Sequence, residues 1–161
     1  MRSGIIMLTR HISNNDDAYL VVDADCDGYT SSAILLNYLN RHCPAWVQRH
    51  VFYFMHDGKQ HGLGDVNIDE IIERGFKLVI CPDSASNDYE QHKKLYNNAI
   101  DVLVLDHHEA EKVSEYACVI NNQLCNYPTK SLCGAGIVYK FCCYIDSLMK
   151  TNYAIDYEDI S

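Results

Sequence analysis

Short apolar runs alternate with longer segments of helical periodicity along most of the chain. Five runs are rich in β-branched or aromatic residues and have the length of strands: residues 18–22, 51–54, 77–81, 101–105 and 117–120. Between and after them, four segments show the spacing of helices: residues 30–39, 68–74, 88–97 and 134–149. Gly75 follows the second of these segments at the position of a helix C-cap.

Continuous apolar strands that alternate with helices are typical of a parallel sheet covered on both faces. We therefore expect an α/β fold, a doubly wound, mostly parallel five-stranded sheet with helices on both faces. The 161 residues suffice for one core, so residues 1–161 are expected to form one domain. In such sheets ligands bind at the carboxyl ends of the strands, which is where candidate functional residues should gather.

Composition narrows the class of protein. No apolar run is long enough to cross a bilayer, and the first residues lack the apolar stretch of a signal peptide. We expect a soluble, cytoplasmic protein with no membrane partner. The eight cysteines include no C-x-x-C pair, so they are expected to be reduced thiols and not a zinc or disulfide framework.

The formal net charge of −9 argues against a broad basic surface for nucleic acid, because phosphate contacts need Lys and Arg. Binding of nucleic acid would need divalent cations held by clustered aspartates, or a basic domain outside this sequence.

The first candidate cluster follows the first predicted strand, where Asp23, Asp25 and Asp27 precede Gly28. Alternate carboxylates of this kind bind hard divalent cations. A calcium EF-hand loop begins in the same way, but here Ile34 occupies the twelfth position, which needs a bidentate Glu. A solvated acidic turn remains an alternative for this segment taken alone.

Two more candidates follow later strands. Asp83 comes directly after the third predicted strand, where a helix cap is the ordinary alternative. Asp106, His107 and His108 follow the fourth, and adjacent histidines on an exposed turn are the alternative there. Imidazole beside carboxylate suits Mn²⁺, Fe²⁺ or Zn²⁺ better than Mg²⁺ or Ca²⁺.

Taken together and in this order, the clusters resemble the motifs of the DHH phosphoesterase family in its form found in RecJ-like single-stranded-DNA exonucleases. The Asp23–Gly28 segment resembles the first motif, Asp83 the second, and the Asp-His-His triplet that ends at His108 the third; residues 132–138 resemble the fourth. The resemblance covers nearly the whole chain.

The resemblance implies a site for two divalent cations, Mn²⁺ first with Mg²⁺ as the alternative, which activate a water for phosphodiester hydrolysis. The metal ligands that it implies are Asp23 and Asp25 for one cation, Asp27 and His107 for the other, and Asp83 as the bridge. His108 would face the substrate phosphate. Asp106 would orient its neighbours, as partners of ligating histidines do, and the implied catalytic group is Asp83, Asp106, His107 and His108.

Two other segments are candidates for substrate contact. Lys59 and His61 lie where RecJ-like members have a basic residue before a glycine-rich loop, and an exposed loop lysine is the alternative for Lys59. Gly134 and Gly136, at the start of the last helix, would let a phosphate approach backbone N–H groups or would serve close helix packing.

One expected feature of the family is not found. Its site takes a last Asp from a segment after the long helix, and Asp146, Asp156 and Asp159 are not expected to be that ligand. We therefore expect a sequence truncated at its C-terminus, without the DHH-associated substrate-binding domain.

The resemblance favours an exonuclease acting on single-stranded DNA, with a role in DNA repair or recombination. One alternative is a DHH phosphodiesterase acting on oligonucleotides or cyclic dinucleotides, or a pyrophosphatase; these open with a His-containing first motif, whereas this chain has Asp23. Another is a non-catalytic module that binds nucleic acid or a replication partner.

Overall fold

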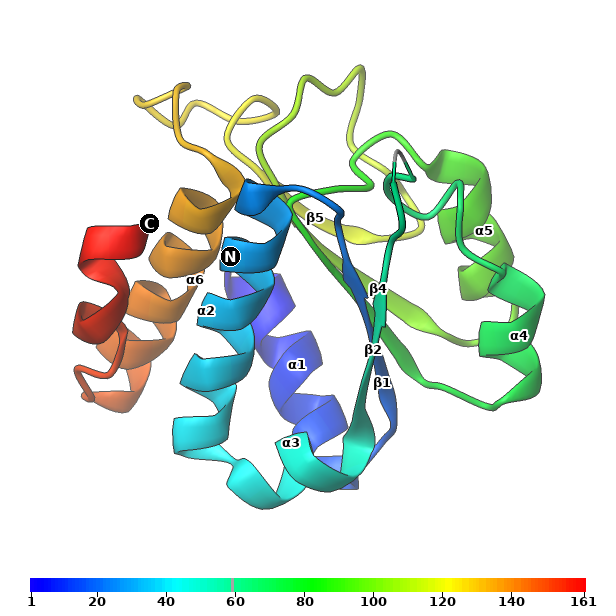
Figure 1. Ribbon diagram of the computed structural model, residues 1–161, viewed down its shortest axis with the longest axis horizontal. Coiled ribbons are helices and arrows are strands. Elements are labelled where there is room, and N and C mark those ends of the chain that lie inside the picture. Colours follow the sequence, from blue (N-terminus) through cyan, green and yellow to red (C-terminus); the bar gives the residue numbers. More distant parts are fainter. Residues whose placement is uncertain (59) are drawn as a thin grey trace.

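The computed structural model describes residues 1–58 and 60–161 and contains one five-stranded sheet with the order β2-β1-β3-β4-β5 (Figure 1). All of its strand pairs are parallel. The strands are β1 (Ala18–Val22), β2 (Val51–Met55), β3 (Leu78–Pro82), β4 (Asp101–Asp106) and β5 (Cys118–Asn121). The predicted α/β fold is confirmed, and each predicted strand lies within one residue of its observed bounds.

The helices are α1 (Arg2–Asn14), α2 (Cys26–His42), α3 (Pro44–His50), α4 (Ile68–Glu73), α5 (Tyr89–Asn97), α6 (Gly134–Met149) and a 3₁₀ helix, η1 (Ala154–Ile160). Helices α1, α3 and η1 were not predicted. In α1 the apolar residues Ile5, Leu8 and Ile12 recur at helical spacing and pack on the core, so the sequence did carry a signal for this helix. The second helix begins at Cys26 and not at residue 30, because its acidic first turn interrupts that pattern.

Helices cover both faces of the sheet because alternate side chains of a strand point in opposite directions. Leu20 and Leu103 belong to the core beneath α1, α2 and α6, whereas Val21 and Val104 belong to the core beneath α4 and α5. The two groups of helices are visible on either side of the strands in Figure 1. Within the described residues, no helix has the length and hydrophobicity needed to cross a membrane.

The strand order creates a point where successive connections leave in opposite directions. Strand β1 lies between β2 and β3, so the chain passes from β1 to one neighbour and later returns on the other side. Open parallel sheets bind ligands at such a switch point, beside the carboxyl ends of the strands. The loops that follow β1 and β3 meet at this edge.

Candidate metal centre

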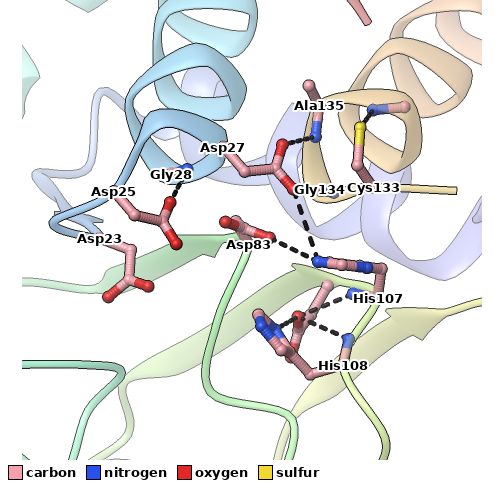
Figure 2. A network of polar contacts seen from close by, with 12 residues as sticks. Asp23, Asp25, Asp27, Gly28, Asp83, His107, His108, Cys133, Gly134 and Ala135 are labelled. Carbon is pink, nitrogen blue, oxygen red and sulfur yellow. Dashed lines mark hydrogen bonds and ion pairs between the residues drawn. The ribbon is translucent and has the colours of Figure 1, made fainter.

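The loop after β1 holds two carboxylates at the start of α2. Asp25 is the N-cap of α2, and its Oδ1 accepts a hydrogen bond of 2.8 Å from the backbone N–H of Gly28 (Figure 2). Gly28 is required here, since an added Cβ would lie 2.6 Å from the Cβ of Asp23. The tight turn therefore places Asp23 and Asp25 side by side under the first turn of α2.

Asp27 connects α2 to the N-terminus of α6. Its carboxylate accepts hydrogen bonds from the backbone N–H groups of Gly134 (2.7 Å) and Ala135 (2.8 Å). A carboxylate at this end of a helix is also stabilised by the helix dipole. The N–H of Gly136 donates to the Sγ of Cys133 at 3.4 Å, so these donors are already engaged.

In this arrangement the N–H groups of Gly134 and Gly136, which were predicted to contact a phosphate, have partners in the protein. The phosphate contact stays a prediction, and the close approach at Gly134 favours the packing alternative for that residue. An added Cβ there would lie 2.1 Å from the Oδ1 of Asp83. Gly134 thus allows α6 to begin directly against the carboxylate of Asp83.

Asp83 is the most constrained acidic residue of the site. It has a left-handed backbone, with φ of 67°, and only 1% of its surface is exposed. Both of its carboxylate oxygens are buried without a hydrogen-bond partner among the described residues. Burial, with the negative charge of Asp27 adding to it, raises the pKa of Asp83 to about 8. A buried carboxylate without donors is costly, and a bound cation would supply the missing partner, so the residues present fit a metal ion.

Asp106, at the end of β4, organises the two histidines that follow it. Its Oδ1 accepts hydrogen bonds from the backbone N–H groups of His107 (2.7 Å) and His108 (3.1 Å) and from the Nδ1 of His108 (2.8 Å). Although burial opposes ionisation, the hydrogen bonds from His108 and Ser86 hold the pKa of Asp106 below its usual range. In turn, the bond to Asp106 raises the pKa of His108 to about 9. This is the geometry expected of an orienting group.

The aspartates and histidines converge on Asp83. The Nε2 of His107 lies 3.2 Å from the Oδ1 of Asp83 and 3.5 Å from the Oδ2 of Asp27 (Figure 2). Asp83, His107 and His108 each offer one ligand atom within 4.8 Å of the others, and so do Asp23, Asp25 and Asp83. Two possible ligand groups therefore share one carboxylate.

His61 lies beside the same cluster. Its Nδ1 hydrogen-bonds the Oδ2 of Asp23, an interaction that raises the pKa of His61. Its ring centroid is 5.3 Å from that of His108. Buried His56 supports this loop through a contact of 2.8 Å between its Nε2 and the carbonyl of Gly62. The other substrate candidate of this segment, Lys59, lies outside the described residues.

The late acidic residues lie away from the cluster. Asp146 accepts a 2.8 Å hydrogen bond from the Tyr38 hydroxyl near the end of α6, about 18 Å from Gly134 at 1.5 Å per residue. Asp156 pairs with Arg41 in the last turn of α2, and Asp159 is exposed. The position expected for the family's last ligand is thus not taken by any of these three residues.

Sequence reasoning missed three polar residues that contact the site loops. Ser86, Asn121 and Gln123 hydrogen-bond the segments that carry Asp83 and the two histidines. The place of Asn121 in the sequence could have indicated it, since this residue ends the fifth strand at the same edge of the sheet as the other candidates.

Together, the fold and the side chains define a class: a parallel α/β domain with carboxylates and imidazoles clustered at the carboxyl edge of its sheet. The sequence profile described as "DHH family, N-terminal domain" matches residues 18–160. The chain belongs to this family.

Relatives and solved structures agree with that assignment. The chain is 42% identical over 154 residues to a putative SPbeta prophage-derived single-strand DNA-specific exonuclease, YorK, of Bacillus subtilis; the match covers 95% of this chain and 26% of the relative. It is 26% identical over 145 residues to the single-stranded-DNA-specific exonuclease RecJ of the same organism, covering 87% of this chain and 18% of RecJ. The chain therefore spans about a quarter or less of these relatives.

The fold is similar to that of exonuclease RecJ in a crystal structure with bound manganese, with a TM-score of 0.79 and 20% identity over 94% of this chain and 38% of RecJ. A second structure, of RecJ from Thermus thermophilus in complex with Mn²⁺, gives a TM-score of 0.74 at 20% identity, over 94% of this chain and 21% of that protein. These likenesses establish the fold.

Proposed function

We propose that this chain is the metal-binding part of an exonuclease that hydrolyses phosphodiester bonds from an end of single-stranded DNA. The observation that carries the proposal is the buried carboxylate of Asp83, which accepts no hydrogen bond among the described residues, although the Nε2 of His107 lies 3.2 Å from its Oδ1, and which belongs to both possible ligand groups. The names of the relatives support the substrate, and the manganese in the similar structures supports the ion.

The proposed ligands form two sets that share Asp83. Asp23 and Asp25 hold one divalent cation, and Asp27 and His107 hold the other. Each oxygen of Asp27 accepts one backbone N–H and keeps a lone pair for a metal. Mn²⁺ is the proposed ion because imidazole accompanies the carboxylates, with Mg²⁺ as the alternative. When bound, a pair of such cations activates water and offsets charge on the attacked phosphate.

The other residues of the site act by holding groups in place. Asp106 holds the Nδ1 of His108, so the opposite ring nitrogen is the one presented to a substrate phosphate. His61 has its Nδ1 on Asp23 and is proposed to contact the same phosphate. Lys59 remains an expectation for this role. With this substrate we also propose a cytoplasmic place of action and a role in DNA repair or recombination.

The test is cleavage of single-stranded DNA labelled at either end, with Mn²⁺, beside RNA dinucleotides, cyclic dinucleotides and pyrophosphate. We expect stepwise release of label from the DNA, loss of that release in Asp83→Ala, and retention in Asp146→Asn, a buried aspartate at the far end of α6. Cleavage of the small substrates alone would favour the phosphodiesterase or pyrophosphatase alternative. Binding of DNA without cleavage in the unsubstituted protein would favour a non-catalytic module.

A further inference from the structure

Asn121 is fully engaged by hydrogen bonds at the end of β5, where it pairs in register with Asp106 of β4. Its Nδ2 donates to the carbonyl of His108 and to the Oγ of Ser86, both at 2.9 Å. Its Oδ1 accepts the backbone N–H of Gln123 at 2.8 Å. Only 5% of the residue is exposed, so water does not compete effectively for these partners.

The two groups that receive the Nδ2 hydrogen bonds belong to different loops. Ser86 lies in the loop after β3, which carries Asp83, and His108 lies in the loop after β4. The backbone N–H of Ser86 also donates to the Oδ2 of Asp106 at 3.1 Å, while the Oδ1 of Asp106 holds the ring of His108. Asp106 and Asn121 therefore join the same two loops through separate sets of hydrogen bonds.

The loop after β3 needs such support. Asp83 and Ala85 both have left-handed backbone conformations, with φ of 67° and 76°, which residues other than glycine rarely adopt. Conformations of this kind persist only where the surrounding structure holds them. The contacts at Ser86 are placed immediately after these strained residues.

A second amide side chain supports the loop after β4. The Nε2 of Gln123 donates to the carbonyl of His107 at 3.2 Å and to the carbonyl of Lys130 at 2.8 Å. The carbonyl groups of both histidines are thus bound by side chains from the segment that begins with Asn121. Of these two amide side chains, Asn121 hydrogen-bonds both ligand loops, whereas the Gln123 bonds described above reach only the loop after β4.

We propose that Asn121 is a positioning residue that sets the spacing between Asp83 and the His107–His108 pair, and thereby the affinity of the site for divalent cations. This inference rests on the proposed function, since it takes these residues as the metal site. Groups that orient metal ligands typically change metal affinity by about 10- to 100-fold when they are removed.

The test compares Asn121→Ala with Asn122→Ala. Asn122 is equally buried, at 3% exposed, but its side chain donates to the carbonyls of Thr129 and Lys130 and makes no hydrogen bond to either ligand loop among the described residues. Electron paramagnetic resonance measures free Mn²⁺, and the spectrum of bound Mn²⁺ reports ligand geometry. We expect Asn121→Ala to weaken Mn²⁺ binding about 10- to 100-fold and to alter the bound spectrum. Asn122→Ala should lower thermal stability with unchanged affinity and spectrum.

Ser86→Ala is the second variant in case Asn121→Ala does not fold. It removes only the hydroxyl that Asn121 binds, so we expect a smaller loss of Mn²⁺ affinity in the same direction. Its control is Ser32→Ala, another buried serine, located in α2. Mn²⁺ binding by folded Asn121→Ala and Ser86→Ala that equals that of their controls would overturn the inference. Absence of Mn²⁺ binding in the unsubstituted protein would instead overturn the proposed metal site itself.

Discussion

At the scale of single residues, two buried aspartates of this chain have opposite effects on stability. Asp83 accepts no hydrogen bond among the described residues, and its pKa is raised to about 8 by burial and by neighbouring charge. Asp146 is also buried, but hydrogen bonds from Thr151, Ala154 and Tyr38 outweigh the effect of burial and lower its pKa. The first arrangement costs stability unless a cation is bound, and the second stabilises the fold.

We predict that Asp83→Asn stabilises the metal-free protein and abolishes Mn²⁺ binding. Between about pH 4 and 8 the unfolded chain loses the Asp83 proton while the folded state keeps it, so the folded state binds more protons and its stability falls as pH rises. The advantage of Asp83→Asn over the unsubstituted protein should therefore grow across this range. Urea unfolding in the presence of a chelator at several pH values measures it.

Asp146→Asn is the matched control, and we expect its effect on the stability of the metal-free protein to have the opposite sign. Because the Asp146 carboxylate accepts hydrogen bonds from a hydroxyl and a backbone N–H, its replacement should destabilise the protein by about 1–3 kcal/mol at pH 7. Mn²⁺ affinity should not change. Equal destabilisation of the metal-free protein by both variants at pH 8 would contradict the cost assigned to the buried carboxylate of Asp83.

At the scale of secondary-structure elements, the N-terminus of α6 lies against the site. Asp27 of α2 binds its first N–H groups, and Gly134 brings its backbone against Asp83 (Figure 2). Contacts between α2 and α6 thereby place one ligand candidate, Asp27, within reach of His107. The position of α6 consequently affects the geometry of the proposed ligands.

We predict that Gly134→Ala weakens Mn²⁺ binding and destabilises the protein by about 1–3 kcal/mol, as overpacking does. The added methyl group would lie 2.1 Å from Asp83 Oδ1, so either the helix or the carboxylate must move. Calorimetric titration with Mn²⁺ and thermal unfolding check the two effects.

Gly136→Ala serves as the control within the same helical turn. The nearest atom to its added methyl group is the Cδ2 of Leu132 at 3.3 Å, the end of a flexible side chain. Alanine is also favoured over glycine in a helix by up to about 1 kcal/mol. We expect this variant to keep Mn²⁺ affinity, and a comparable loss in both glycine variants would contradict the role given to Gly134.

At the scale of the whole molecule, the proposed metal site would couple ion binding to folding. The chain has a formal net charge of −9, and several of its carboxylates are concentrated at one edge of the sheet. A divalent cation that binds only the folded state adds RT ln(1 + [L]/Kd) to its stability, about 2.7 kcal/mol at a hundredfold excess over Kd.

We predict that saturating Mn²⁺ raises the Tm by about 5–10 °C for a chain of this size. Scanning calorimetry with and without Mn²⁺ measures the shift, and NaCl at matched ionic strength controls for screening of the net charge. Asp83→Asn should show no shift beyond that of NaCl. An equal shift with Mn²⁺ in both proteins would place the ion outside the proposed site.

Much of the fold could be predicted because its signals are local. Each strand is a continuous apolar run, and the acidic or histidine residues that follow β1, β3 and β4 are adjacent to those runs in sequence. Helix α3 has seven residues, too few for an apolar stripe to be recognised, whereas α1 carries Ile5, Leu8 and Ile12 at helical spacing and was missed despite that signal. The sequence could not show that Asp27 accepts hydrogen bonds from the first N–H groups of α6, because that contact joins residues more than 100 positions apart.

By itself, the sequence determined that the chain forms a parallel α/β sheet and that Asp23, Asp83 and His107 lie at its carboxyl edge. The physical reason is that strand pattern and residue order are properties of neighbouring positions, and parallel strands bring their ends together. Only the tertiary structure decided that the buried Asp83 carboxylate accepts no hydrogen bond among the described residues and that Asn121 joins two loops. Burial and hydrogen-bond pairing arise between segments distant in sequence, and no local pattern specifies how closely those segments approach.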